Sequence, residues 1–285
     1  MIKNKELYSF SKLNAFHQCQ YQYYLNYILK EKGKKNVYGH LGGIVHDLCE
    51  KLSKEEITLE DAKDKWFEEI DNAEESGMEF PTEKSKIAYI ECVSDYLEYF
   101  TPLPGKEIHT EEYFILDVEG NSLRGFIDFY SVDHENKTID LIDYKTSSKF
   151  SKKDLESEKV YQLILYGMYL EKKYPGYKIN NVGFDMLKYA KNIHTGKVKL
   201  RNEIMQYEMY DYDRWLLYID YNNKNKEKLK GFVIDTINEI QSKDKNEENN
   251  WEDNSKNSFY CNNLCSFGDK CKYNKKVKRR FKTNK

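Results

Sequence analysis

Residues 124–148 read RGFIDFYSVDHENKTIDLIDYKTSS, and their pattern predicts the centre of the fold. Apolar and polar side chains alternate over residues 122–132 and again over 138–145, which is the pattern of two half-buried β-strands. The polar residues between them centre on Glu135-Asn136 and predict a tight turn. The sequence therefore predicts an antiparallel hairpin at the centre of the protein.

Three ionisable side chains of this hairpin are expected to gather at one place. A turn at Glu135-Asn136 sets Asp128 directly opposite Asp143, and strand alternation puts Asp143 and Lys145 on one face. Opposed side chains have Cβ atoms about 4.5–5.5 Å apart, and two carboxylates that close repel each other. The pair predicts a bound Mg²⁺ or Mn²⁺, with Lys145 stabilising charge on a phosphate. The alternative is a surface hairpin with scattered acids and a lysine.

Outside the hairpin, the pattern predicts helices before it and a mixture of strands and helices after it. The spacing of apolar side chains is mostly helical over residues 8–100, and a further strand is expected over 111–118. The later segments are a helix over 155–173, strands over 180–188 and 197–210, and a helix over 212–240. This order predicts an α/β protein with a mixed central sheet flanked by helices.

Composition narrows the class of protein. The chain has 285 residues, of which 33% are charged and 39% hydrophobic, with a net charge of −2. No apolar run approaches the roughly 20 residues of a membrane span, and the N-terminus lacks a signal-peptide pattern, so we expect a cytoplasmic protein without membrane contact. Residues 270–285 hold nine Lys/Arg and no acid, which suits either phosphate contact or a solubilising end.

The hairpin and its flanks resemble the RecB-like branch of the PD-(D/E)XK nuclease superfamily. Gly125–Asp128 followed by Asp143–Lys145 is similar to the core motif of that superfamily, in the variant that has glycine in place of the proline. Gly43–His46 is similar to the upstream helix motif, and Gln162–Tyr166 is similar to the downstream Q-x-x-x-Y helix. The resemblance covers roughly residues 8–275.

This resemblance implies a restriction-endonuclease-like core and a role for each motif residue. Lys145 would be the catalytic cation, and Gln162 and Tyr166, which share a helical face, would position the substrate or Lys145. The implied ligands of Mg²⁺ or Mn²⁺ are His46, Asp128, Asp143 and the backbone carbonyl of Tyr144.

The implied activity is hydrolysis of DNA phosphodiester bonds by an exonuclease that acts on single-stranded DNA or single-stranded ends. The setting would be recombination, repair or CRISPR adaptation, with a recombination or CRISPR adaptation protein as a partner. One alternative is an inactive DNA-binding or scaffold protein with a nuclease fold, which the complete set of motif residues disfavours. Another is a nuclease that acts on RNA.

The cysteines predict a second metal centre. Cys261, Cys265 and Cys271 lie within eleven residues, and a cytoplasmic chain is not expected to hold structural disulfides. Three thiolates need a fourth ligand, for which Cys19 is the candidate and His17 a weaker competitor. Four thiolates suit either a structural Zn²⁺ or an iron–sulfur cluster. The remaining two cysteines, Cys49 and Cys92, fall in expected helices and are interpreted as packing residues.

The Cys19 segment and the late cysteines resemble those of the AddB nuclease domain and the CRISPR adaptation exonuclease. In that group, one early cysteine joins three late ones around a 4Fe–4S cluster, which the resemblance implies here. The chain departs from that pattern at Gln20, where proline is usual, and in the three residues between Cys261 and Cys265, where two are usual.

The domain organisation follows from these expectations. We expect a nuclease domain over residues 1–240, with helices over about 8–100, a catalytic core over about 105–210 and a closing helix over about 212–240. A polar linker over 241–258 would then lead to the cysteine cluster and basic tail over 259–285, joined to Cys19.

Overall fold

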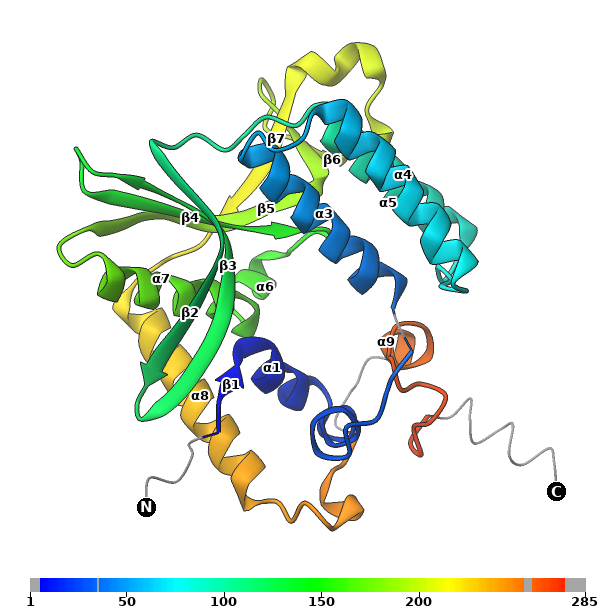
Figure 1. Cartoon of the computed structure of the whole chain (residues 1–285), viewed down its shortest axis with the longest axis vertical. Helices are drawn as coiled ribbons and strands as arrows, with labels where there is room; N and C mark the ends of the chain where they lie inside the picture. Colours follow the sequence, from blue (N-terminus) through cyan, green and yellow to red (C-terminus); the bar gives the residue numbers. More distant parts are fainter. Residues whose placement is uncertain (1–5, 35, 254–257, 275–285) are drawn as a thin grey trace. The chain divides into compact units, whose positions relative to one another are not determined.

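The computed structural model describes residues 6–34, 36–253 and 258–274 (Figure 1). The chain separates into two compact units, each built from several segments. The central unit comprises Val37–Phe114 and Phe126–Leu229, and the terminal unit comprises Met1–Asn36, Ile115–Gly125 and Lys230–Lys285. The division into a nuclease domain, linker and cysteine-rich end that the sequence suggests stays a prediction.

The described residues form a seven-stranded sheet, and its mixture of parallel and antiparallel pairs confirms the predicted mixed central sheet. The order along the sheet is β1-β3-β4-β5-β6, with β2 paired to β3 and β7 paired to β5. The pair β4–β5 is parallel, whereas β3–β4, β5–β6 and β5–β7 are antiparallel. The strands are β1 Tyr8–Ser9, β2 Glu107–Val118, β3 Asn121–Asp133, β4 Thr138–Lys145, β5 Lys178–Asn192, β6 Val198–Leu200 and β7 Tyr212–Tyr218.

The predicted register of the β3–β4 hairpin is confirmed. Its pairs run from Asp133 opposite Thr138 to Phe129 opposite Ile142, so the next residue of each strand is Asp128 and Asp143. The turn between β2 and β3 has Glu119 and Gly120 in the left-handed region, at φ 49° and 81°. The two aspartates therefore lie at neighbouring positions of adjacent strands.

Three helices of the central unit pack together beside the hairpin. They are α3 Val37–Ser53, α4 Leu59–Glu75 and α5 Glu83–Glu98. Thr58 and Thr82 each cap the start of a helix through a capping box, which satisfies backbone N–H groups that have no partner inside the helix. The apolar faces of these helices form a core with Phe129, Ile142 and Tyr144 of the sheet. The short helix α6 Lys152–Leu155 and the longer α7 Tyr161–Lys173 follow β4, and α7 contacts β4 and β5.

Two expectations about the later elements are wrong. The strand expected over 197–210 is the three-residue β6 followed by 3-10 turns over Arg201–Glu203 and Gln206–Asp211. The closing helix expected from residue 212 begins instead at Asn223, because Tyr212–Tyr218 pairs with β5 as the strand β7. A short apolar run such as WLLY is compatible with either structure, and the available partner strand decides.

The terminal unit contains both ends of the described chain. It begins with β1, α1 Phe10–Gln18, α2 Gln20–Tyr23 and a π-helical turn over Tyr24–Ile28. The second part of α8 Asn223–Ser242, a 3-10 turn over Glu248–Asn250 and the short helix α9 Ser258–Asn263 complete it. No helix of the described residues has both the length and the apolar composition needed to cross a bilayer. Most of the basic tail expected over 270–285 lies outside the described residues.

One apolar side chain of the expected polar linker is buried in the terminal unit. Trp251 is 0% exposed, and its ring stacks at 5.9 Å from Tyr23 and 5.4 Å from Tyr24. The edge of Phe16 meets it at 6.3 Å, and its indole N–H donates to the carbonyl of Asp244 at 3.1 Å. The segment after α8 is therefore packed against the N-terminal helices through Trp251. A single apolar residue forms no periodic pattern, so the sequence did not predict this contact.

Candidate metal site

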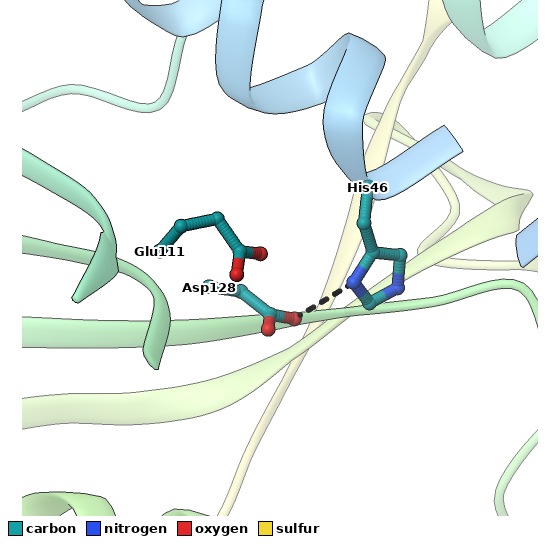
Figure 2. A group of neighbouring side chains, drawn as sticks. All are labelled: His46, Glu111 and Asp128. Carbon is teal, nitrogen blue, oxygen red and sulfur yellow. Dashed lines mark ion pairs between the residues drawn. The ribbon is translucent and has the colours of Figure 1, made fainter. Parts of the chain in front are cut away.

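Three side chains from separate elements of the central unit converge on one point (Figure 2). His46 lies on α3, Glu111 on β2 and Asp128 on β3, and one ligand atom of each lies within 4.8 Å of the other two. His46 Nδ1 is 3.3 Å from Asp128 Oδ2, as drawn in Figure 2. One imidazole and two carboxylates form a donor set that suits a divalent cation.

A glycine lets α3 bring His46 to this point. A Cβ atom on Gly42 would lie 3.2 Å from the hydroxyl oxygen of Thr146, a tight contact just beyond the end of β4. His46 follows Gly42 by four residues and so lies on the same face of the helix. Gly43, which begins the motif identified in the sequence, has nothing within 4 Å of its Cβ position. The close approach of α3 to Thr146 therefore depends on Gly42. The sequence motif begins instead at the neighbouring Gly43.

Glu111 is a member of this group that the sequence analysis missed. Its backbone lies in the left-handed region, with φ of 50°, inside β2. Such a conformation is uncommon for a residue other than glycine and breaks the alternation of the strand. Alternation, on which the prediction of strand faces depends, therefore does not place Glu111 beside Asp128. The doubled acid Glu111-Glu112 in a strand before the Gly125–Asp128 motif was the available signal.

The next residue, Glu112, holds this irregular part of β2 in place. Its carboxylate accepts hydrogen bonds from Tyr130 and from the Tyr169 hydroxyl at 2.8 Å. The Lys173 ammonium donates to both of its oxygens, at 2.7 and 2.6 Å. A carboxylate with these donors fixes the backbone at residue 112 and hence the direction of the adjacent Glu111.

Asp143 and Lys145 lie on one face of β4, as predicted, and form an ion pair with each other. Asp143 is 1% exposed, and its Oδ1 atom has no hydrogen-bond partner among the described residues. Burial lowers the pKa of Lys145, but the charges of Asp143 and Asp128 outweigh this and raise it, so the ammonium stays charged. Burial also raises the pKa of Asp143, and repulsion from Asp128 adds to the effect.

The acidic groups of the site disturb one another's ionisation. Burial raises the pKa of Glu111 to about 7, with the charges of Asp128 and Glu50 adding to the effect. Burial also favours neutral Asp128, but the hydrogen bond and charge of His46 outweigh it and lower the pKa of Asp128. The pKa of His46 is raised, because its bond to Asp128 outweighs the effect of burial. The three acids Glu111, Asp128 and Asp143 exceed the two cations His46 and Lys145, and the raised pKa values of Glu111 and Asp143 reflect this.

These observations fit a divalent metal ion. The buried Asp143 Oδ1 without a partner is the kind of atom that a metal satisfies. Asp128 is oriented by the backbone N–H of Tyr144, which donates to its Oδ2 at 3.0 Å, so the other oxygen stays available. The Tyr144 side chain lies in the core, and the ligand role of its carbonyl stays a prediction.

Gln162 and Tyr166 lie together on α7, as their spacing predicts. The Gln162 amide donates to the Tyr166 hydroxyl at 2.6 Å, and the Tyr166 ring meets the edge of Phe114 at 5.4 Å. Burial raises the pKa of Tyr166, and the nearby charges of Asp143 and Asp128 raise it further. The pair is therefore close to the acidic site, while its role in positioning stays a prediction.

In the terminal unit, all four cysteines of the expected cluster line one cavity of about 250 Å³. They are Cys19, Cys261, Cys265 and Cys271, accompanied by polar side chains that include Asp253. The Cys19 thiol lies 3.6 Å from Asp253 Oδ1. His17, the competing ligand considered from sequence, packs against Phe232 at 5.5 Å and does not line this cavity. Cys49 and Cys92 are fully buried, which is consistent with packing.

Comparison with known proteins identifies the family. The family described as the PD-(D/E)XK nuclease superfamily matches residues 8–272, which include every motif discussed above. No curated protein sequence matches the chain. The matched region also includes the mixed sheet with its flanking helices and the group of His46, Glu111 and Asp128. The chain therefore belongs to the PD-(D/E)XK nuclease superfamily.

Proposed function

We propose that this protein is a metal-dependent DNA exonuclease that acts on single-stranded DNA or single-stranded ends. The observation that carries the proposal is the convergence of His46, Glu111 and Asp128 beside the buried pair of Asp143 and Lys145. Membership of a nuclease superfamily makes nucleic acid the substrate class. The choice of DNA, of single strands and of an exonuclease mode is the proposal.

The residues of the site would have different roles in phosphodiester hydrolysis. His46, Glu111, Asp128 and Asp143 would hold Mg²⁺ or Mn²⁺, which when bound lowers the pKa of a coordinated water and neutralises phosphate charge. Lys145 carries a positive charge at neutral pH and stabilises the negative charge that develops on the phosphate.

Gln162 and Tyr166 would position the substrate or Lys145. Their hydrogen bond fixes both side chains on one face of α7. Fixed groups at the reacting phosphate favour hydrolysis because less orientation entropy is lost when the substrate binds.

Cleavage of end-labelled DNA with and without Mg²⁺ or Mn²⁺ tests the proposed activity. Linear single strands, circular single strands and blunt duplexes are compared, each with the parental protein and with Lys145→Ala. We expect metal-dependent release of labelled nucleotides from linear single strands, and intact circles. Cleavage of circles would replace the exonuclease mode by an endonuclease mode. Cleavage of RNA instead of DNA would show that RNA is the substrate. Binding without any cleavage would favour an inactive DNA-binding or scaffold protein.

We further propose that Cys19, Cys261, Cys265 and Cys271 hold a 4Fe–4S cluster. Their shared cavity of about 250 Å³ is far larger than the roughly 10–15 Å³ that a single water-sized occupant needs. Zinc bonds of about 2.3 Å would draw four thiolates to within about 3.8 Å of one another. The volume of the shared cavity is the observation that supports the larger group.

The composition of this centre is measured directly. We expect protein purified without oxygen to contain iron and sulfide and to absorb visible light, and Cys19→Ser to lose both properties. One zinc per chain without iron would show a zinc site in place of the cluster. Protein without either metal, and with Cys19→Ser as stable as the parent, would contradict a metal centre.

A protein partner from recombination or CRISPR adaptation stays a prediction.

A further inference from the structure

Two aromatic side chains of the central unit are exposed together next to the metal site. Tyr113 of β2 is 46% exposed and Phe126 of β3 is 53% exposed. Their ring centroids are 5.2 Å apart, with the ring planes inclined at 53°. Single exposed aromatic residues are ordinary on protein surfaces, but two in contact form a small apolar patch that water solvates poorly.

The position of this pair ties it to the acidic group. Phe126 precedes Asp128 by two residues on one strand, and Ile127 between them is fully buried. Alternation therefore puts Phe126 and Asp128 on the same side of β3, with Cα atoms about 6.6 Å apart. Tyr113 follows Glu111 by two residues on β2, so each aromatic residue is close in sequence to a candidate metal ligand.

The segment that follows Lys145, up to the start of α6, adds positive charge on the same unit. Lys149, Lys152 and Lys153 are exposed, and none of them pairs with a carboxylate within the described part of the chain. Such lysines are available to phosphate groups, which attract cations regardless of base sequence. The central unit therefore carries a base-sized pair of aromatic rings, a candidate metal site and exposed lysines that do not pair with a carboxylate within the described residues, although Lys149 lies over the ring of Trp215.

We propose that Tyr113 and Phe126 form a stacking platform for the base of a nucleotide next to the scissile phosphate. The proposal rests on the nuclease function proposed above and gives a physical reason why the nuclease would prefer single-stranded DNA to a duplex. An aromatic ring stacks on any base, whatever its identity, provided that a face of the base is free. Bases of a duplex are already stacked on their neighbours, so the platform selects single-stranded DNA.

Binding is measured without cleavage, with the Lys145→Ala protein, Mn²⁺ and a single-stranded oligonucleotide that carries 2-aminopurine. Stacking quenches the fluorescence of this base, so we expect quenching on binding. We expect the quenching to disappear when Tyr113→Ala and Phe126→Ala are added. The matched control is Tyr210→Ala, which removes a tyrosine that is 80% exposed and remote in sequence. Restoration of the quenching by Phe126→Trp would support stacking as the cause.

Kinetics on the otherwise parental protein provide the second readout. Loss of both rings should raise KM for single strands roughly 5- to 150-fold, the range expected for one stacked base, while kcat and Mn²⁺ affinity change little. If the parent cleaves single strands and the double variant has the same KM, the platform is overturned and the nuclease proposal stands. If the parent cleaves no nucleic acid, the nuclease proposal fails, and unaltered 2-aminopurine fluorescence would then overturn the platform as well.

Discussion

At the scale of single residues, the candidate metal site is organised by excess negative charge. Glu111 and Asp128 lie together with His46, and the buried pair of Asp143 and Lys145 is close enough for Asp143 and Asp128 to affect each other's charge. Burial and mutual repulsion raise the pKa of Glu111 and of Asp143, so part of this charge is lost to protonation in the metal-free protein. A bound cation restores it, and metal uptake should release protons.

The first prediction concerns the pH dependence of stability without metal. Glu111 has a pKa of about 7 when folded, above the ordinary value of a glutamate, so the folded state binds a proton that the unfolded chain has lost. The raised pKa of His46 acts in the same direction. The melting temperature in EDTA should therefore fall as the pH rises from about 5 to 8.

Thermal unfolding with EDTA or with Mn²⁺ measures this effect. The rise in melting temperature on adding Mn²⁺ should be greater at pH 8 than at pH 6, because fewer protons then compete with the metal. Glu111→Gln serves as the control and should flatten the dependence seen in EDTA. A melting temperature in EDTA that rises between pH 5 and 8 would contradict the assigned charges.

The second prediction compares two adjacent glycines of α3. Gly42→Ala should force α3 away from Thr146 by a few tenths of an ångström, displace His46 and weaken Mn²⁺ binding roughly tenfold. Gly43→Ala has open space and should instead stabilise the helix by about 0.5–1 kcal/mol, with metal affinity retained. Calorimetric titration of both variants with Mn²⁺ distinguishes them. Equal affinities would show that the close approach at Gly42 does not position His46.

At the scale of elements, the irregular part of β2 determines where Glu111 lies. The third prediction is that Glu112→Gln weakens Mn²⁺ binding although Glu112 does not belong to the ligand group. The loss of its charge removes the strong hydrogen bonds from Tyr169 and Lys173 that hold the backbone beside Glu111. The exposed Glu60→Gln is the matched control. Lower melting temperature with unaltered metal affinity would limit Glu112 to a structural role.

The elements also show what the sequence could predict. The β3–β4 hairpin was predictable because alternation and a polar turn agree, and these two signals set Asp128 beside Asp143. Glu111 was not predictable by the same means, because its positive φ removes the alternation on which the assignment of faces depends. The strand β7 was misassigned because its identity depends on pairing with β5, a contact that a local pattern does not contain.

At the scale of the whole molecule, the described ends of the chain are joined within the terminal unit by ordinary packing as well as by the proposed cluster. Trp251 lies among Phe16, Tyr23 and Tyr24, and the Tyr21 hydroxyl donates to Glu248 at 2.7 Å. These contacts need no metal. Loss of the cluster should therefore loosen the cysteine-rich segment while leaving Trp251 in place.

The fourth prediction separates packing from the cluster. Trp251→Ala should destabilise the protein by about 3–5 kcal/mol, as expected for a large side chain removed from a core. Phe259→Ala, which removes a ring that is 55% exposed, should have little effect. Urea unfolding followed by far-UV circular dichroism measures both variants. If the two variants are equally stable, Trp251 does not anchor the terminal unit.

We propose that His46, Glu111, Asp128 and Asp143 bind a catalytic divalent cation. Titration of the parental protein with Mn²⁺, with free Mn²⁺ measured by electron paramagnetic resonance, tests this binding. We expect saturable binding in the parent and in Lys145→Ala, at least tenfold weaker binding in Asp128→Asn, and DNA cleavage in the parent alone among these three. Unaltered Mn²⁺ binding by a folded Asp128→Asn protein would show that these residues do not form the metal site.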